Sequence, residues 1–122
     1  MTREQKDLLI KDLCGRLSHG VKCKILETNE VKILGSIQYD GENTLFDFWE
    51  DDQKTHYGYQ LYLSEFKPYL LPISSMNEEQ DEEFMNIQIG YPSVDWFDKN
   101  QFDYRGLIPM GLAIDATGLN IY

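Results

Sequence analysis

Two thiols and an imidazole are the first side chains of this 122-residue chain that could do chemistry. Cys14, His19 and Cys23 follow one another closely in the sequence. A thiol beside a histidine base is the arrangement of a cysteine nucleophile. Cys14, however, also belongs to an apolar helical stripe, and free thiols in such positions usually act as small packing side chains. We therefore expect both cysteines to be free, structural residues in a reducing compartment.

Carboxylates offer a second kind of chemistry, the binding of a divalent cation. Asp47, Glu50, Asp51 and Asp52 lie close together but lack the ordered spacing of a calcium loop. We interpret them, and His56 in the polar DDQKTH loop, as solvated side chains. The sequence contains no GxGxxG, GKS or GKT phosphate loop, HExxH or GxSxG motif. We expect no cofactor and no metal.

The densest acidic run is EEQDEEF, and it provides the candidate interaction residues. These are Glu78, Glu79, Glu82 and Glu83. Such a run could imitate the phosphates of a nucleic acid and occupy a basic protein, or it could be the solvated face of an exposed helix. Ser75 and Glu78 have the spacing of a capping box, so we expect a helix to begin at Ser75.

The aromatic segment DWFDKNQFDYRGLIPMG, residues 95–111, is dense enough in apolar side chains to require burial. We predict two short helical pieces, the first capped by Ser93, and the second capped by Asp103 and stopped by Pro109. A buried guanidinium needs a carboxylate partner. Asp103 and Arg105 are therefore predicted to form a structural ion pair, with an active-site ion pair as the alternative.

Tyrosines alternate in the segment that follows the DDQKTH loop, and they could form a stacking platform for bases. The residues concerned are Tyr57, Tyr59, Tyr62 and, further on, Tyr69. No lysine or arginine lies among Tyr57, Tyr59 and Tyr62 to supply the charge that a single-strand binder needs. We expect them to belong to the core of a sheet.

The elements that must position these residues begin with a helix over residues 2–17. Thr2 and Gln5 have capping-box spacing, and Gly20 is a natural left-handed stop. The predicted apolar stripe consists of Leu9, Ile10, Leu13, Cys14 and Leu17.

Strand-like segments then follow at residues 21–27, 31–39, 44–50 and 57–63. Gly35, inside the second, indicates a bulge or a close backbone approach. Residues 66–76 carry Pro68 and Pro72 and are expected to lie extended over the apolar body. The predicted fold class is α+β: an N-terminal helix, an antiparallel sheet or partly closed barrel of three or four strands, and two or three short C-terminal helices.

Length and charge bound the possible functions. A chain of 122 residues suits a single domain, residues 1–122. Residues 1–26 carry six basic and three acidic side chains, whereas the remainder carries five basic and eighteen acidic, which gives the net charge of −10. Most of this surface would repel a phosphate backbone, so we expect no direct nucleic-acid binding. No apolar run is long enough to cross a membrane and no signal peptide is present, so the expected compartment is the cytoplasm.

The segments KPYLLPISSMNEEQ and DWFDKNQFDYRGLI, followed by GLAIDATGLNIY, carry a resemblance to a known family. The chain resembles a set of short, uncharacterised proteins common in gut Bacteroidetes genomes, where they occur in many copies, on phage or other mobile elements. The resemblance covers most of the chain and brings no activity, ligand or catalytic residue. Pro109 departs from the family pattern, in which a charged residue is expected.

Three functional hypotheses remain open at this stage. The first is a small acidic, non-enzymatic accessory protein that binds a protein partner by shape and charge. The second is an inhibitor that imitates nucleic acid and blocks a basic protein. The third is a small hydrolase-like enzyme without a recognisable motif. An exposed apolar patch would favour the first, regularly spaced carboxylates the second, and a pocket lined by a thiol, His19 or converging carboxylates the third.

Overall fold

The computed structural model describes residues 1–39, 41, 43–50, 56–87 and 91–122, with the side chains of 56–59 and 91–92 excepted. Its elements are α1 (Arg3–Arg16), β1 (Lys22–Ile25), β2 (Val31–Tyr39), β3 (Thr44–Trp49), β4 (His56–Leu61), β5 (Phe66–Pro72), α2 (Glu78–Met85), α3 (Tyr91–Lys99), β6 (Phe102–Asp103) and β7 (Ile114–Asp115). The 3-10 turns η1 (Leu17–His19), η2 (Leu63–Glu65) and η3 (Ile73–Ser75) join some of them. The predicted α+β class is therefore confirmed.

Helix α1 begins and ends as its sequence predicts. Thr2 is the N-cap, and its side chain and that of Gln5 form the reciprocal capping box. Gly20 follows η1 in the left-handed conformation, with φ at 70°. Leu9 and Leu13 are buried, whereas Cys14 is exposed, so the predicted apolar stripe is narrower than expected.

The sheet corrects the expected size and shape. Within the described residues it has seven strands in the order β4-β3-β2-β1-β5-β6, with β7 also paired to β5, and it is open instead of closing into a barrel. Strands β1 to β4 form the predicted antiparallel meander. Strand β5 then pairs antiparallel with β1 along one edge and parallel with β6 and β7. Because β5 pairs with these additional strands, it does not pair with β4 among the described residues, and the sheet stays open.

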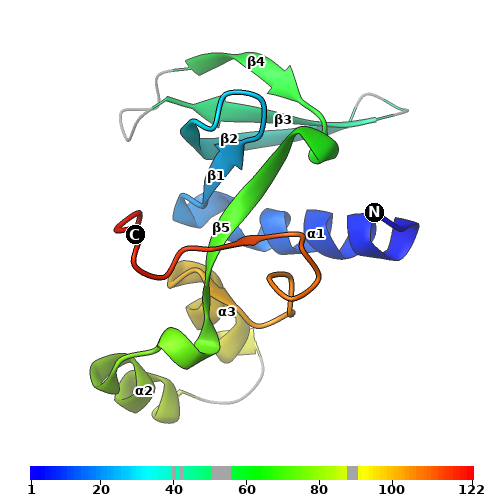
Figure 1. Ribbon diagram of the computed structural model, residues 1–122. Coiled ribbons are helices and arrows are strands. Elements are labelled where there is room, and N and C mark those ends of the chain that lie inside the picture. The colour runs from blue at the N-terminus through cyan, green and yellow to red at the C-terminus, as the bar shows by residue number, and fades with distance from the viewer. Residues whose placement is uncertain (40, 42, 51–55, 88–90) are drawn as a thin grey trace.

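Strand β5 was not predicted as a paired strand because it contains two prolines, and a proline cannot donate a hydrogen bond to a strand ladder. In the structure both prolines lie where pairing changes. Pro68 is the last residue paired with β1, and Tyr69 is the first paired with β7. Pro72 ends the pairing with β6 and precedes η3. Figure 1 shows β5 running from the sheet, past α1, to α2.

The prediction of a bulge or close backbone approach at Gly35 is confirmed. The register between β2 and β3 shifts between Leu34 and Ser36, and a Cβ on Gly35 would lie 2.5 Å from the Trp49 indole. Only glycine fits beneath this ring.

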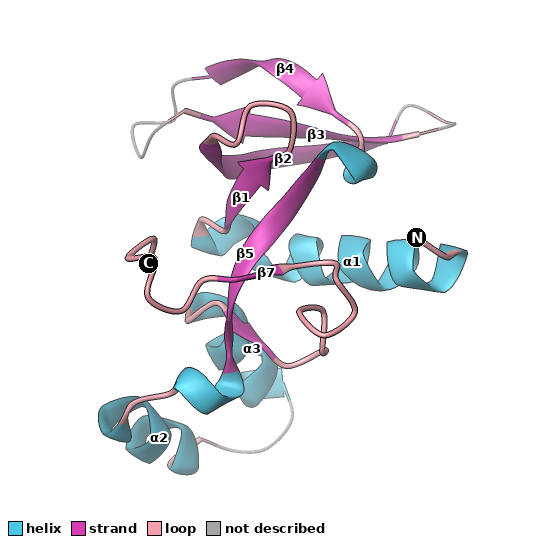
Figure 2. Ribbon diagram, viewed as in Figure 1, coloured by secondary structure: helices cyan, strands magenta, loops and turns pink. Residues whose placement is uncertain are grey.

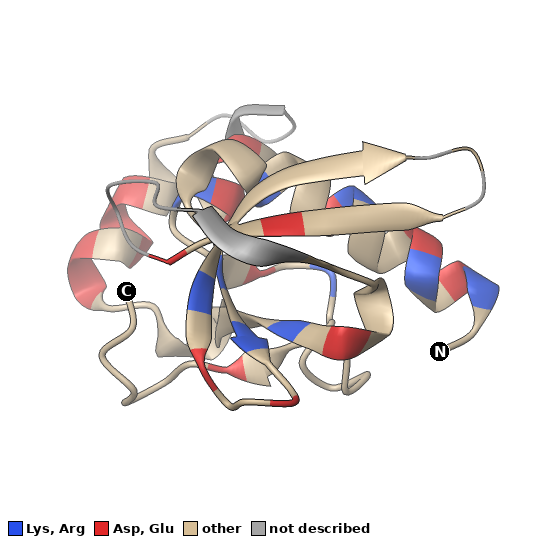
Figure 3. Cartoon of the chain, turned by 90° about the horizontal axis from the view of Figure 1, so that it is seen from above, with Lys and Arg blue, Asp and Glu red and all other residues tan. Residues whose placement is uncertain are grey.

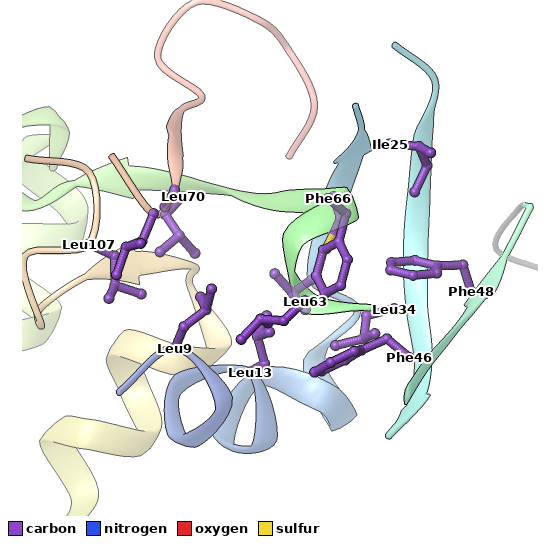
Figure 4. Close-up of a cluster of buried hydrophobic side chains, with 14 residues drawn as sticks. Leu9, Leu13, Ile25, Leu34, Phe46, Phe48, Leu63, Phe66, Leu70 and Leu107 are labelled. Carbon is purple, nitrogen blue, oxygen red and sulfur yellow. The ribbon is translucent and has the colours of Figure 1, made fainter. Parts of the chain in front are cut away.

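The core lies between α1 and the sheet (Figures 2 and 4). Phe66 of β5 is at its centre, with ring centroids 5.0 Å from those of both Phe46 and Phe48 in edge-to-face geometry. Leu9 and Leu13 of α1 pack into the same cluster. Buried aromatic and leucine side chains of this kind each contribute about 1.5–3 kcal/mol to folding.

The C-terminal part differs from the two predicted helical pieces. Helix α3 begins at Tyr91, so Ser93 lies inside it and is not its N-cap. Residues 102–103 form strand β6, and residues 107–111 form turns. After Phe102 and Asp103 pair with β5, Gly106 has φ at 77°, in the left-handed region, so a right-handed helix does not continue through this segment. Asp103 nevertheless accepts hydrogen bonds from the backbone amides of Leu107 and Ile108, both at 2.9 Å, and so caps these turns as expected.

Candidate functional site

A buried ion pair on α1 is the most polar feature of the interior. Asp12 and Arg16 both have no exposed surface. The guanidinium meets the carboxylate as a fork, with Nε 2.8 Å from Oδ2 and Nη2 3.1 Å from Oδ1. Their spacing of four residues, with the acid first, is the favourable order on a helix. Two-pronged contacts of this kind are among the strongest hydrogen bonds in proteins.

Arg16 also ties α1 to the C-terminal part of the chain. Its Nη2 donates to the backbone carbonyl of Phe102 at 2.6 Å, and its Nη1 donates to that of Phe97 at 3.5 Å. One side chain therefore links α1 with both α3 and β6. We call Asp12, Arg16, Asp98, Tyr104 and Arg105 the ionic joint.

Arg105 corrects the predicted pair with Asp103. Its Nε lies 3.2 Å from Asp12 Oδ1, and its guanidinium lies 4.6 Å from the centroid of the Tyr104 ring. The carboxylate of Asp103 is used by backbone amides instead. The principle behind the prediction holds, because the half-buried guanidinium does have a carboxylate, but the partner comes from α1, 93 positions away.

Asp98 completes the joint at the contact of α1 with α3. It is 5% exposed, Oδ1 lies 3.9 Å from Arg16 Nε, and this oxygen accepts no hydrogen bond in the described structure. Burial raises the pKa of Asp98, and the attraction of Arg16 offsets this in part. A Cβ on Gly15 would lie 2.7 Å from Asp98 Oδ2, so glycine permits this close approach.

An aromatic stack connects the joint to α2. Trp96 stacks on Phe102 at 5.6 Å, and Phe97 stacks on Tyr104 at 5.3 Å. Phe84 of α2 lies against both α3 aromatics, 5.4 Å from Trp96 and 5.0 Å from Phe97 between centroids. Aromatic pairs at these distances contribute about 0.5–1.5 kcal/mol beyond the area that they bury. The position of α2 therefore depends on α3, which the joint holds.

The N-cap of helix α2 lies two residues later than predicted. This N-cap is Asn77, which forms the capping box with Gln80, whereas the Ser75 hydroxyl donates to the carbonyl of Pro72 at 2.6 Å within η3. The two possible capping boxes overlap in the sequence. The Ser75 hydroxyl is bonded within the turn after Pro72, so it does not cap α2.

The four predicted interaction carboxylates divide into two groups. The Glu83 carboxylate accepts a hydrogen bond from Trp96 Nε1 at 2.8 Å, so it anchors the helix. Glu78, Glu79 and Glu82 are exposed, and within the described part of the chain they form no ion pair or side-chain hydrogen bond. Met85, one turn further along, is 77% exposed. In Figure 3 α2 is the largely red helix at the left, whereas α1 mixes both signs of charge.

The thiols and His19 do not form a nucleophilic pair among the described contacts. Cys14 is exposed, and burial raises the pKa of the Cys23 thiol far above its usual range, so Cys23 stays a neutral packing residue. His19 instead faces α3, with Nε2 3.5 Å from Asp95 Oδ1.

The remaining candidates fall partly outside the described residues. Asp51 and Asp52 lie there, as do the side chains of His56, Tyr57 and Tyr59. Among the rest, Glu50 lies 3.9 Å from Lys32, Tyr62 is 51% exposed and Tyr69 is buried. The side chains described contain no group of three or more His, Cys, Asp or Glu that could hold a metal ion. None of the described helices is long and apolar enough to cross a membrane.

Arg16 was counted only as one of the six basic side chains of residues 1–26, and the Asp12–Arg16 pair was not predicted from the sequence. A signal for it was present: an acid and an arginine four residues apart, adjacent to Leu9 and Leu13 on the buried side of the helix.

Comparison of the chain with protein-family models, with curated proteins and with solved structures gave no match.

Proposed function

We propose that this protein is a non-enzymatic interaction module that binds a basic protein partner through the exposed side of α2. The observation that carries the proposal is the set of unpaired carboxylates of Glu78, Glu79 and Glu82 beside the exposed Met85. Positions 78, 82 and 85 recur at helical spacing and share one side of the helix. We call Glu78, Glu79, Glu82 and Met85 the α2 face.

Helix stability alone does not account for this face. Glu78 and Glu79 lie in the first turn, where the helix dipole favours acidic side chains, but Glu82 lies in the last turn, where it disfavours them. The pairs 78/82 and 79/83 also place like charges four residues apart, which costs about 0.2–0.5 kcal/mol each. The helix contains no basic residue to offset this repulsion.

The same features suit recognition of a partner. A polarisable methionine surrounded by charged groups has the layout of a small interface, with an apolar centre and a polar rim. The net charge of −10 would steer a basic partner towards the protein over a range set by the ionic strength. On the opposite side of α2, Phe84 and Glu83 hold the helix to α3, so the face is presented on a supported element.

The test compares capture by three immobilised proteins from a lysate of the native host. The first is the parent, and the second carries Glu78→Gln, Glu79→Gln and Glu82→Gln. The third carries Glu4→Gln, Asp7→Asn and Glu27→Gln, which removes the same charge from exposed positions elsewhere. We expect a basic protein to be retained by the parent and the control, lost with the α2 variant, and retained less as salt rises. Equal retention by both variants would reject the α2 face.

A nucleic-acid mimic is the second candidate, favoured by the regular spacing of the same carboxylates. The two functions differ at Met85, because a mimic has no use for an apolar centre. Met85→Ser should weaken capture by an interaction module and leave a mimic unaffected. Added duplex DNA should displace the partner of a mimic.

A further inference from the structure

A pocket of about 260 Å³ opens beside the first turn of α1. Gln5 and Leu9 of α1, Leu63 and Ser64 of η2, and Phe66 and Lys67 of β5 contribute to its wall. Residues 110–112 also line it. The N-terminal end of α1 and helix α2 lie at opposite ends of the molecule in Figures 1 and 3, so this pocket is separate from the α2 face.

Part of the pocket wall is the hydrophobic core itself. Leu9, Leu63, Phe66 and Leu112 all line it, and each is at most 9% exposed. Leu9, Leu63 and Phe66 are labelled in Figure 4, where they lie between α1 and β5. Two methionines, Met1 at 50% and Met110 at 43% exposure, complete the lining. Methionine is flexible and polarisable, so these two side chains can adjust to an apolar occupant.

The polar side chains of the lining all carry hydrogen-bond donors, and Lys67 adds a positive charge. Lys67 and the Ser64 hydroxyl form no ion pair or side-chain hydrogen bond among the described residues, and the Gln5 amide nitrogen donates to none. Among the described residues the lining contains no aspartate or glutamate, although the protein carries a net charge of −10. The pocket also touches the first turn of α1, where the helix dipole is positive. An anionic group is therefore favoured at this position.

The strand register adds a separate reason for an anion. Lys67 of β5 lies directly opposite Lys24 of β1 in the antiparallel pair. Like charges at directly opposed positions destabilise a sheet. An anion beside Lys67 would relieve this repulsion.

We propose that the pocket binds a medium-chain carboxylate, a free fatty acid of about eight carbons. Its chain lies against Leu9, Leu63 and Phe66, and its carboxylate faces Lys67. The volume sets the length: at about 30 Å³ for each water-sized group, 260 Å³ holds about nine non-hydrogen atoms, close to the roughly ten of octanoate, whose carboxylate lies at the pocket opening.

The test is a calorimetric titration of the full chain with the sodium salts of butanoate, hexanoate, octanoate, decanoate and dodecanoate. Each buried methylene should raise the affinity about fourfold. The rise should stop near octanoate, because longer chains extend out of the pocket. Affinity that keeps rising through dodecanoate would show adsorption to exposed apolar surface, and the absence of binding by octanoate would also overturn the proposal.

Matched lysine variants test the carboxylate contact. Lys67→Gln should weaken octanoate binding about threefold to tenfold, whereas Lys24→Gln, outside the pocket, should weaken it by a smaller factor because it removes only the repulsion of Lys67. Octanol should bind both variants equally. Equal losses of octanoate affinity in the two variants would mean that general surface charge causes the effect, and would reject the contact with Lys67.

Methyl chemical shifts give the location without relying on any variant. Octanoate should shift the methyl signals of Leu9, Leu63 and Leu112 of the parent protein. Shifts confined to other leucines would place the ligand elsewhere and reject the pocket.

Discussion

The ionic joint and the α2 face carry charge in opposite ways. In the joint, Asp12 and Arg16 have no exposed surface, and each is held by several hydrogen bonds. On the α2 face, Glu78, Glu79 and Glu82 are exposed and have no partner within the described structure. Buried charge must be paired, because desolvation of an unpaired ion costs several kcal/mol. Exposed charge carries no such requirement and stays available to a partner.

The difference teaches that the number of charges in a segment says little about their role. The charges of the two carboxylates and two guanidiniums in the joint cancel, whereas every charged residue of α2 is acidic. A stability measurement should therefore respond strongly to the joint and weakly to the α2 face, and a binding measurement should respond in the reverse order.

Breaking the joint should have the largest effect on stability. Arg16→Met removes the guanidinium that holds Asp12 and leaves the carbonyl of Phe102 without its donor. We expect a loss of about 3–5 kcal/mol in the free energy of unfolding, measured by chemical denaturation. Arg3→Met, at the exposed start of the same helix, is the control and should change little. Equal losses in the two variants would contradict a special role for the buried pair.

Removing the aromatic link between the two regions should come next. Trp96→Ala deletes a ring that contacts Phe84, Phe97 and Phe102. We expect a loss of about 3 kcal/mol, at the lower end of the range for a buried aromatic ring. Met85→Ala, on the exposed side of α2, serves as the control. A denaturation midpoint unchanged by Trp96→Ala would show that this ring is not part of the core.

Asp98 sharpens the comparison through its pH dependence. Burial raises its pKa in the folded protein above the value in the unfolded chain. The folded state therefore holds the proton more tightly, and stability falls as pH rises from about 4 through the raised pKa. Asp98→Asn cannot lose a proton, so it should be more stable than the parent at neutral pH.

Denaturation at a series of pH values measures this difference. Parent and Asp98→Asn should converge below about pH 4, where the parent carboxyl is protonated. The gap at neutral pH should be smaller than the two losses above. A parent that remains the more stable protein at neutral pH would mean that the attraction of Arg16 outweighs burial.

The smallest effect is expected on the α2 face. The combined change Glu78→Gln, Glu79→Gln and Glu82→Gln should alter the free energy of unfolding by no more than about 0.5 kcal/mol. Relief of like-charge repulsion favours the variant, and weaker interaction with the helix dipole opposes it. Thermal and chemical denaturation would both report this. A loss above about 2 kcal/mol in the free energy of unfolding would mean that these residues stabilise the fold instead of binding a partner.

Local signals predicted much of the fold. The Thr2 and Gln5 capping box, the stop at Gly20, the close approach at Gly35 and the four-stranded meander all depend on residues near one another in the sequence or on backbone conformation. The polar capping role of Asp103 was likewise predictable, because its partners follow within five residues.

What could not be predicted depends on long-range partners. Arg105 has acids on both sides of it in the sequence but takes Asp12 from the first helix. Strand β5 has two prolines and becomes a strand because β1, β6 and β7 offer it edges. For the candidate site, the run of carboxylates was visible in the sequence. That Glu83 differs from the others could not be predicted, because its partner Trp96 is brought beside it only by the fold.

The double pairing of β5 has a consequence for the order in which the chain folds. Strands β1 to β4 are joined by short connections, so their contacts close small loops and form quickly. The parallel pairs of β5 with β6 and β7 close loops of about thirty and forty-five residues, respectively, and parallel pairing across a long loop is intrinsically slow. We therefore expect a nascent chain to leave the ribosome with its antiparallel half formed first. The edge of β5 would then stay open to other strands until residues 102–115 arrive, which makes this edge the point where misassembly competes with completion of the fold.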